Sequence, residues 1–166
     1  AVSIDYRRAP EYHLPAAYED SWTALKWVAS HGNGNGGSED WINSYADLSR
    51  VFLAGDSAGA NICHHMCTRN AYENLSGIEI EGTTLVHPFF WGDVPIGNEP
   101  TDPVTRAFLG LIWQTASPSS DGCNDPFINS HLDPNFGRLG CKKVLVLVAE
   151  KDALRERGRN YYERLK

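Results

Sequence analysis

The sequence contains no long apolar segment, and no hydrophobic run approaches the ~18 residues that a membrane-spanning helix requires. It also has no excess of basic residues, because 15 Lys and Arg stand against 21 Asp and Glu, for a formal net charge of −6. Nucleic acids and anionic membranes need a basic face, so we expect neither as a partner. The 166 residues, 42% of them hydrophobic, are enough for one globular domain and too few for two.

Cysteine is scarce as well, with only Cys63, Cys67, Cys123 and Cys141. Two disulfides are arithmetically possible, but nothing else in the composition indicates a small disulfide-stapled scaffold. The first two cysteines lie one helical turn apart beside His64 and His65, a pattern that a metal site could use. Structural zinc sites usually gather four ligands in two clustered pairs, so we favour free thiols packed on a helix, with no metal and no cofactor.

The chain also has no N-terminal Met and no signal peptide. It begins inside a predicted strand and stops inside a predicted helix. We therefore expect both ends to be cut and residues 1–166 to be the central part of a single domain. A cytosolic location is the default expectation.

The pattern of apolar residues predicts alternating strands and helices. Strands are predicted at residues 2–6, 50–54, 82–87 and 143–149, helices at 15–31, 60–70, 104–115 and 154–165, a short helix or turn at 41–45, and an exposed loop at 32–37. The run at 143–149 is apolar at nearly every position, which is typical of a strand buried on both faces. Such strands, alternating with helices, predict a parallel α/β sheet.

A Gly-x-Ser-x-Gly pattern occupies residues 55–59, where a predicted strand leads directly into a predicted helix. A serine on such a sharp turn has strained backbone geometry, and the small neighbours Gly55, Ala58 and Gly59 give it room. The turn lifts the Ser57 hydroxyl above the carboxyl edge of the sheet and aims the Ala58 N–H at a developing oxyanion. An ordinary tight turn is the alternative, but the context favours Ser57 as a nucleophile.

Asp152 directly follows the last predicted strand, at the end of a parallel sheet that faces the ligand crevice. A catalytic acid belongs there, where it orients a histidine. A helix N-cap is the alternative role, since Asp suits that position too. The order of serine before aspartate favours Asp152 as the acid, with Glu150 as the second candidate.

The catalytic base is missing from the sequence. In folds of this kind the histidine follows the acid, yet all six histidines precede Asp152, namely His13, His31, His64, His65, His87 and His131. His87 ends a strand next to Pro88 and could line the crevice. We nevertheless expect each histidine to be packed or on the surface, so the sequence shows no complete triad.

Several motifs resemble those of plant class I carboxylesterases, which belong to the hormone-sensitive-lipase-like hydrolases. The motifs lie at residues 5–11, 14–20, 55–62, 64–65, 87–92, 139–143, 150–152 and 154–158. The resemblance implies an α/β-hydrolase fold, a mostly parallel sheet with helices on both faces, here incomplete at both ends. It implies Ser57 as nucleophile, Asp152 as acid and the Ala58 N–H as an oxyanion donor. The family's oxyanion loop would precede Ala1, its histidine would follow Lys166, and residues 93–138 would contribute to a cap over the pocket.

The implied function is hydrolysis of a small-molecule carboxylic ester through an acyl-enzyme. Two related activities are alternatives: gibberellin receptors bind a hormone, and isoflavanone dehydratases eliminate water from a flavonoid. The receptor elbow usually reads Gly-Asp-Ser-Ser-Gly-Gly, whereas this chain has Ala58 and Ala60, which favours an enzyme. The acyl group, the alcohol group and the oligomeric state are left open.

In the family's strand order the oxyanion strand lies between the strands matching residues 2–6 and 51–54. Without this strand the segment at 2–6 loses its neighbour in the sheet, and without the base Ser57 is a weak nucleophile. We therefore expect these 166 residues alone to be inactive and poorly stable.

Overall fold

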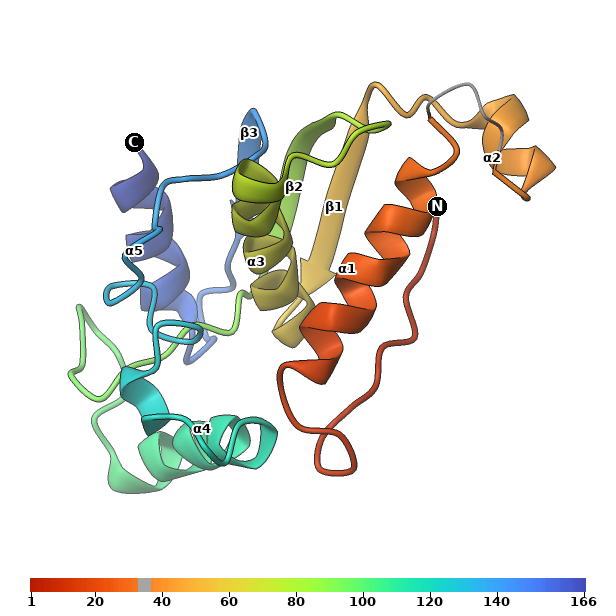
Figure 1. The fold of residues 1–166 in the computed structure, drawn as a ribbon. Coiled ribbons are helices and arrows are strands. Elements are labelled where there is room, and N and C mark those ends of the chain that lie inside the picture. The colour runs from red at the N-terminus through yellow and green to blue at the C-terminus, as the bar shows by residue number, and fades with distance from the viewer. Residues whose placement is uncertain (33–36) are drawn as a thin grey trace.

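The computed structural model describes residues 1–32 and 37–166, so most of the loop predicted at 32–37 lies outside the described residues. The elements, drawn in Figure 1, are α1 (Ala16–Ala29), α2 (Asp40–Tyr45), β1 (Val51–Asp56), α3 (Ala58–Glu73), β2 (Ile80–Val86), α4 (Pro103–Ala116), the 3-10 helix η1 (Gly122–Asn124), β3 (Lys143–Leu147) and α5 (Arg155–Leu165). Every predicted helix and the three later predicted strands are present, with small shifts at their ends.

The strands of the described residues form one parallel sheet in the order β1, β2, β3. The register aligns Leu53 with Thr83 and Thr83 with Val144, so these residues share one face. Parallel strands need long crossovers, and α3 supplies the one between β1 and β2. The prediction of a parallel α/β fold is confirmed.

The first helix packs as its apolar spacing predicts. Its buried apolar residues include Tyr18, Trp22, Leu25 and Ala29, the four positions that form the predicted stripe. Pro15 is the N-cap and the helix begins at Ala16, one residue later than predicted. The stripe buries this side of α1 against α3 and the sheet (Figure 1).

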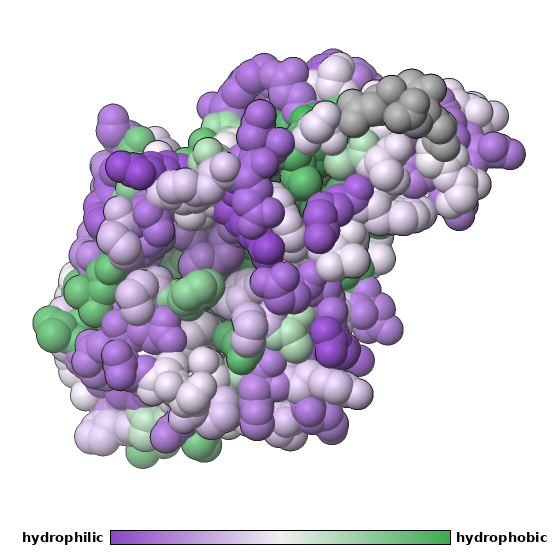
Figure 2. Space-filling view, viewed as in Figure 1, coloured by the Kyte–Doolittle hydropathy of each residue, from purple (hydrophilic) through white to green (hydrophobic). Residues whose placement is uncertain are grey.

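One core joins the helices to one face of the sheet. Met66 of α3 and Tyr161 of α5 belong to the same buried cluster as Leu53 of β1 and Leu85 of β2. On their outer side these helices are mostly hydrophilic, as Figure 2 shows. None of the described helices combines the length and the hydrophobicity needed to cross a bilayer.

The other face of the sheet carries exposed apolar side chains. Phe52 is 56% exposed, Leu145 53% and Leu147 44%. These residues alternate with buried or half-buried ones along their strands, as the two-residue period of a strand requires. The expectation that the apolar run at 143–149 is buried on both faces is wrong for the described residues, because no element covers this face of β3. The resemblance implies helices on both faces, but α1, α3 and α5 of the described residues all share the core of the opposite face.

The predicted strand at residues 2–6 is wrong, because the structure assigns no strand there. A strand exists only where a neighbour accepts and donates its backbone hydrogen bonds. Here a cavity of about 300 Å³ separates Val2 and Ile4 from Phe52 and Ala54 of β1. Local β-propensity is present in this segment, but a pairing partner within the described residues is not.

Helix α4 begins with a well-formed cap. The Asp102 side chain accepts a hydrogen bond from the Thr105 N–H at 2.8 Å, and Pro103 occupies the first turn, where its missing N–H costs nothing. The helix contributes Leu109 and Trp113 to a second buried cluster, which also contains Phe89, Trp91, Ile128 and Leu154. This cluster attaches the segment that holds α4 to the carboxyl end of the sheet.

Candidate active site

Ser57 occupies the turn between β1 and α3 with φ 53° and ψ −112°. A positive φ is uncommon for a residue with a side chain, and strain of this kind concentrates at functional sites. The turn depends on Gly55, because a Cβ there would lie 2.2 Å from the Gly59 carbonyl carbon. A Cβ on Gly59 would meet nothing within 4 Å, so crowding explains only the first of the two glycines.

Backbone hydrogen bonds tie Ser57 to the adjacent strand. Its N–H donates to the Val86 carbonyl at 2.9 Å, and its carbonyl accepts from the Phe89 N–H at 3.1 Å. Ala58 is the first residue of α3, and the first N–H groups of a helix have no partner within the helix. An anion that develops beside Ser57 therefore meets free N–H groups and the positive end of the helix dipole.

Ser57 and Ala58 line a cavity of about 350 Å³. Most of the wall is apolar or aromatic, and includes Tyr12, Leu14, Phe89, Ile112 and Trp113. A volume of this size suits a small organic group. Two of these residues, Ile112 and Trp113, belong to α4, so the segment predicted to form a cap contributes to the wall.

Asp152 lies between β3 and α5, as predicted. Its Oδ1 accepts a hydrogen bond from the Leu154 N–H at 2.9 Å. The N-cap residue of α5 is Leu154, so Asp152 orders the turn before the helix without being its N-cap. Glu150, the second candidate for the acid, is exposed on the same loop.

The structure brings His87 to Asp152, a contact that the sequence analysis did not predict. The His87 Nδ1 lies 3.0 Å from Asp152 Oδ2, with side chains that are 35% and 24% exposed. Ser57, His87 and Asp152 follow β1, β2 and β3, so they lie along the same edge of the sheet. The sequence analysis located His87 at a strand end, where it could line the crevice. It did not predict that Asp152 would be its partner.

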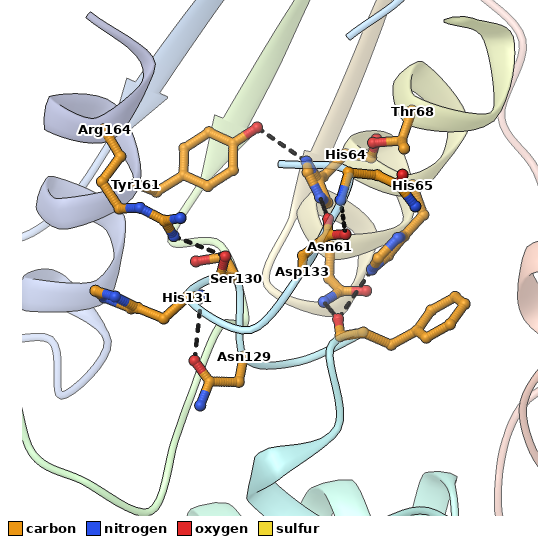
Figure 3. Close-up of polar contacts among 12 residues, drawn as sticks. Asn61, His64, His65, Thr68, Asn129, Ser130, His131, Asp133, Tyr161 and Arg164 are labelled. Carbon is orange, nitrogen blue, oxygen red and sulfur yellow. Dashed lines mark hydrogen bonds and ion pairs between the residues drawn. The ribbon is translucent and has the colours of Figure 1, made fainter. Parts of the chain in front are cut away.

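His64 is buried and lies between Tyr161 and Asp133, as Figure 3 shows. It is 1% exposed, with Nδ1 3.0 Å from the Tyr161 hydroxyl and Nε2 3.4 Å from Asp133 Oδ2. Burial works to raise the pKa of Asp133, but hydrogen bonds, first of all from His64, lower it overall. The Asp133 carboxylate thus accepts a hydrogen bond from the His64 Nε2–H. Burial raises the pKa of Tyr161, and its hydroxyl donates a hydrogen bond to His64 Nδ1. His64 therefore joins α3, α5 and the loop at Asp133.

His65 is also structural. Its Nε2 lies 2.9 Å from the Phe127 carbonyl, which also accepts from Asn61 Nδ2 at 2.8 Å (Figure 3). A carbonyl only accepts, so Nε2 carries the proton. Burial, together with the neighbouring His64, lowers the pKa of His65 to about 3. The prediction of packed histidines is confirmed for these two.

Two of the cysteines interact, and the hydrogen bond from Cys67 lowers the pKa of the Cys141 thiol. All four are free thiols, as predicted, and burial raises the pKa of Cys63 to about 11. A thiol with a raised pKa is a weak nucleophile at neutral pH. Within residues 1–32 and 37–166 no group of three or more His, Cys, Asp or Glu is placed to hold a metal ion.

Residues 1–166 match the model of a family described as alpha/beta hydrolase fold, and the chain belongs to this family. It is 54% identical over 174 residues to "Probable carboxylesterase 13" of Arabidopsis thaliana, a match that covers 99% of this chain and 53% of that protein. It is 44% identical over 166 residues to "Tuliposide A-converting enzyme 1, chloroplastic" of Tulipa gesneriana, covering 99% and 42%.

Among solved structures, the chain is similar to the carboxylesterase EstE1 from a metagenomic library. The TM-score is 0.72 at 27% identity, and the match covers 97% of this chain and 52% of that one. The chain thus spans about half the length of the relatives it matches. The similarity shows that the chain shares its fold with that esterase.

Proposed function

We propose that the protein is a carboxylic ester hydrolase with Ser57 as nucleophile, the Ala58 N–H as an oxyanion donor and Asp152 as the acid. The strained backbone of Ser57, on a strand-to-helix turn beside an apolar cavity, carries the proposal. The names of the matched relatives support an esterase over a hormone receptor or a dehydratase.

In the proposed reaction the Ser57 hydroxyl attacks the ester carbonyl and loses its proton to a histidine base. The carbonyl oxygen becomes an oxyanion, which the Ala58 N–H and the start of α3 stabilise. The alcohol leaves with the proton from the histidine, and water then hydrolyses the acyl-enzyme by the same steps in reverse order. Asp152 orients the imidazole and stabilises its charged form.

The histidine base and the second oxyanion donor are implied by the resemblance to the family. In that family the histidine corresponds to a position after Lys166 and the oxyanion loop to a position before Ala1. The 166 residues alone are therefore predicted to turn over no ester, because a serine without its base stays protonated and is a weak nucleophile.

The substrate class follows from the cavity. Its apolar wall supports an ester with a small apolar acyl or alcohol group, and the α4 residues in that wall support the proposal that residues 93–138 form a cap over the group. The tulip relative is named for tuliposide A and for the chloroplast, which are properties of that protein. For this chain the cytosolic location stays a prediction.

Replacement of Ser57 in the full-length protein tests the function. Ser57→Ala should abolish both turnover of a short p-nitrophenyl ester and covalent labelling by a fluorophosphonate probe. Ser119→Ala, at an exposed serine on the loop after α4, is the matched control and should change neither. Labelling that persists in Ser57→Ala would place the nucleophile elsewhere.

A further inference from the structure

The contact between His87 and Asp152 links two neighbouring strand ends. The His87 N–H donates to the Leu147 carbonyl at 2.8 Å, so the backbone of His87 is fixed to the end of β3. One residue earlier, Val86 accepts the hydrogen bond from the Ser57 N–H at 2.9 Å. The position of His87 is therefore determined on both sides, by the strand that leads to the serine and by the strand that leads to the acid.

His87 also has a strained backbone. Its φ is 44°, in the left-handed region, and Pro88 follows it. A positive φ is unfavourable for a residue that has a Cβ atom. Strained residues persist only where the surrounding structure holds them, and they concentrate at functional sites. Ser57 is strained in the same way on the adjacent strand end.

The environment of the ring indicates its role. The Nδ1 atom is buried, and its contact with Asp152 Oδ2, at 3.0 Å, is close but poorly aligned. A carboxylate only accepts hydrogen bonds, so the contact is favourable when Nδ1 carries a proton. Catalytic hydrogen bonds are often poorly aligned without substrate and tighten when the complex forms.

The two oxygens of Asp152 then have different partners. Oδ1 accepts from the Leu154 N–H at 2.9 Å, and Oδ2 faces the His87 ring. A carboxylate that accepts a hydrogen bond at one oxygen and faces a ring nitrogen at the other is restrained in its rotation when that nitrogen carries a proton. The acid of a serine hydrolase needs a fixed direction, because it sets the tautomer and orientation of the base.

We propose that His87 is a positioning residue of the ester-hydrolysing site, which acts through Asp152 by donating Nδ1–H to Oδ2. The proposal rests on the proposed function, and it adds a histidine that is distinct from the base. His87 holds the carboxylate, and the base takes the proton from Ser57.

Three substitutions in the full-length protein separate this role from others. The side-chain amide nitrogen of Asn occupies about the place of Nδ1 in His, whereas that of Gln occupies about the place of Nε2. His87→Asn should therefore keep most of the activity, while His87→Ala and His87→Gln should lower kcat on the order of 10²-fold, the effect of a misplaced catalytic group. KM should change little, because His87 does not line the cavity beside Ser57.

The pH profile adds a readout that a purely structural role would not move. The acidic limb of the kcat profile reports the protonation of the histidine base. A misplaced Asp152 stabilises the charged imidazole less well, so that limb should move to lower pH in His87→Ala and return in His87→Asn. His131→Asn, at an exposed histidine, is the control for the substitution itself. Thermal melting of each variant identifies those that have lost their fold.

The outcomes distinguish the two proposals. If His87→Asn is as impaired as His87→Ala while both remain folded, donation from Nδ1 is not the role of His87. If His87→Asn falls to the level of Ser57→Ala, the imidazole itself is required and His87 is the base. Both of these results leave the esterase function standing, whereas full activity of Ser57→Ala overturns the function and the role of His87 together.

Discussion

The Tyr18 hydroxyl donates a hydrogen bond to Asn61 Oδ1 at 2.7 Å and so joins α1 to α3 one turn after Ser57. Asn61 is 3% exposed, and its Nδ2 donates to the carbonyls of Phe89 and Phe127. The start of the helix that carries the serine is thus connected to three other segments. Each polar atom of the amide has a partner, as a buried amide requires.

Tyr18→Phe should lower the free energy of unfolding by about 1–3 kcal/mol, because Asn61 Oδ1 is left buried without its donor. Tyr45→Phe is the matched control, since Tyr45 is 88% exposed. Urea unfolding of the full-length variants measures both. Equal stability of Tyr18→Phe and the wild type would show that water replaces the lost hydroxyl.

Acid should destabilise the fold through His65. Its pKa is about 3 in the folded chain against an ordinary value of 6.5, so the unfolded chain binds the proton more readily. The contribution of the neutral His65 to the free energy of unfolding is complete above pH 6.5 and is lost as the pH falls towards 3. His65→Gln keeps an N–H donor for the Phe127 carbonyl but does not titrate.

The stability of His65→Gln should therefore fall less steeply between pH 6 and 4 than that of the wild type, as measured by urea unfolding at a series of pH values chosen from the pKa shift. The lowered pKa of Asp133 acts in the same direction, so some acid sensitivity should persist. Parallel curves for the two proteins would contradict the shift assigned to His65.

Asp152→Asn should lower kcat on the order of 10⁴-fold, because an amide in place of the carboxylate favours the wrong tautomer of the base. Glu150→Gln, at the exposed second candidate on the same loop, should have little effect. Steady-state kinetics on a p-nitrophenyl ester compare the two. The opposite pattern would identify Glu150 as the acid.

The two glycines of the elbow should respond differently to alanine. Gly55→Ala forces a Cβ to 2.2 Å from the Gly59 carbonyl carbon, so the turn must shift, at a cost of about 1–3 kcal/mol, the range for overpacking. A Cβ at residue 59 meets no atom within 4 Å, and the residue lies in the first turn of α3. The Gly59→Ala protein should therefore be as stable as the wild type or slightly more stable. Thermal melting of both variants, with fluorophosphonate labelling of Ser57, tests the contrast.

The sequence alone determined the elements whose signals are local. The stripe of Tyr18, Trp22 and Leu25 identified a helix, and the apolar run at residues 50–54 identified a strand, whose expected burial holds only for Leu53. The elbow at Ser57 was predictable for the same reason, since a strand, small residues and a helix follow one another directly. In each case the period of the apolar residues or the size of adjacent side chains carried the information.

Only the tertiary structure decided which distant groups meet. Residues 2–6 have the composition of a strand, but a strand needs a hydrogen-bonded neighbour. Among the described residues, a cavity lies between this segment and β1, so no neighbouring strand pairs with it. His87 and Asp152 meet because the register of β2 and β3 brings their strand ends together, and His64 lies between Tyr161 and Asp133 because α5 packs against α3. Such contacts join residues far apart in the chain, and no local pattern encodes them.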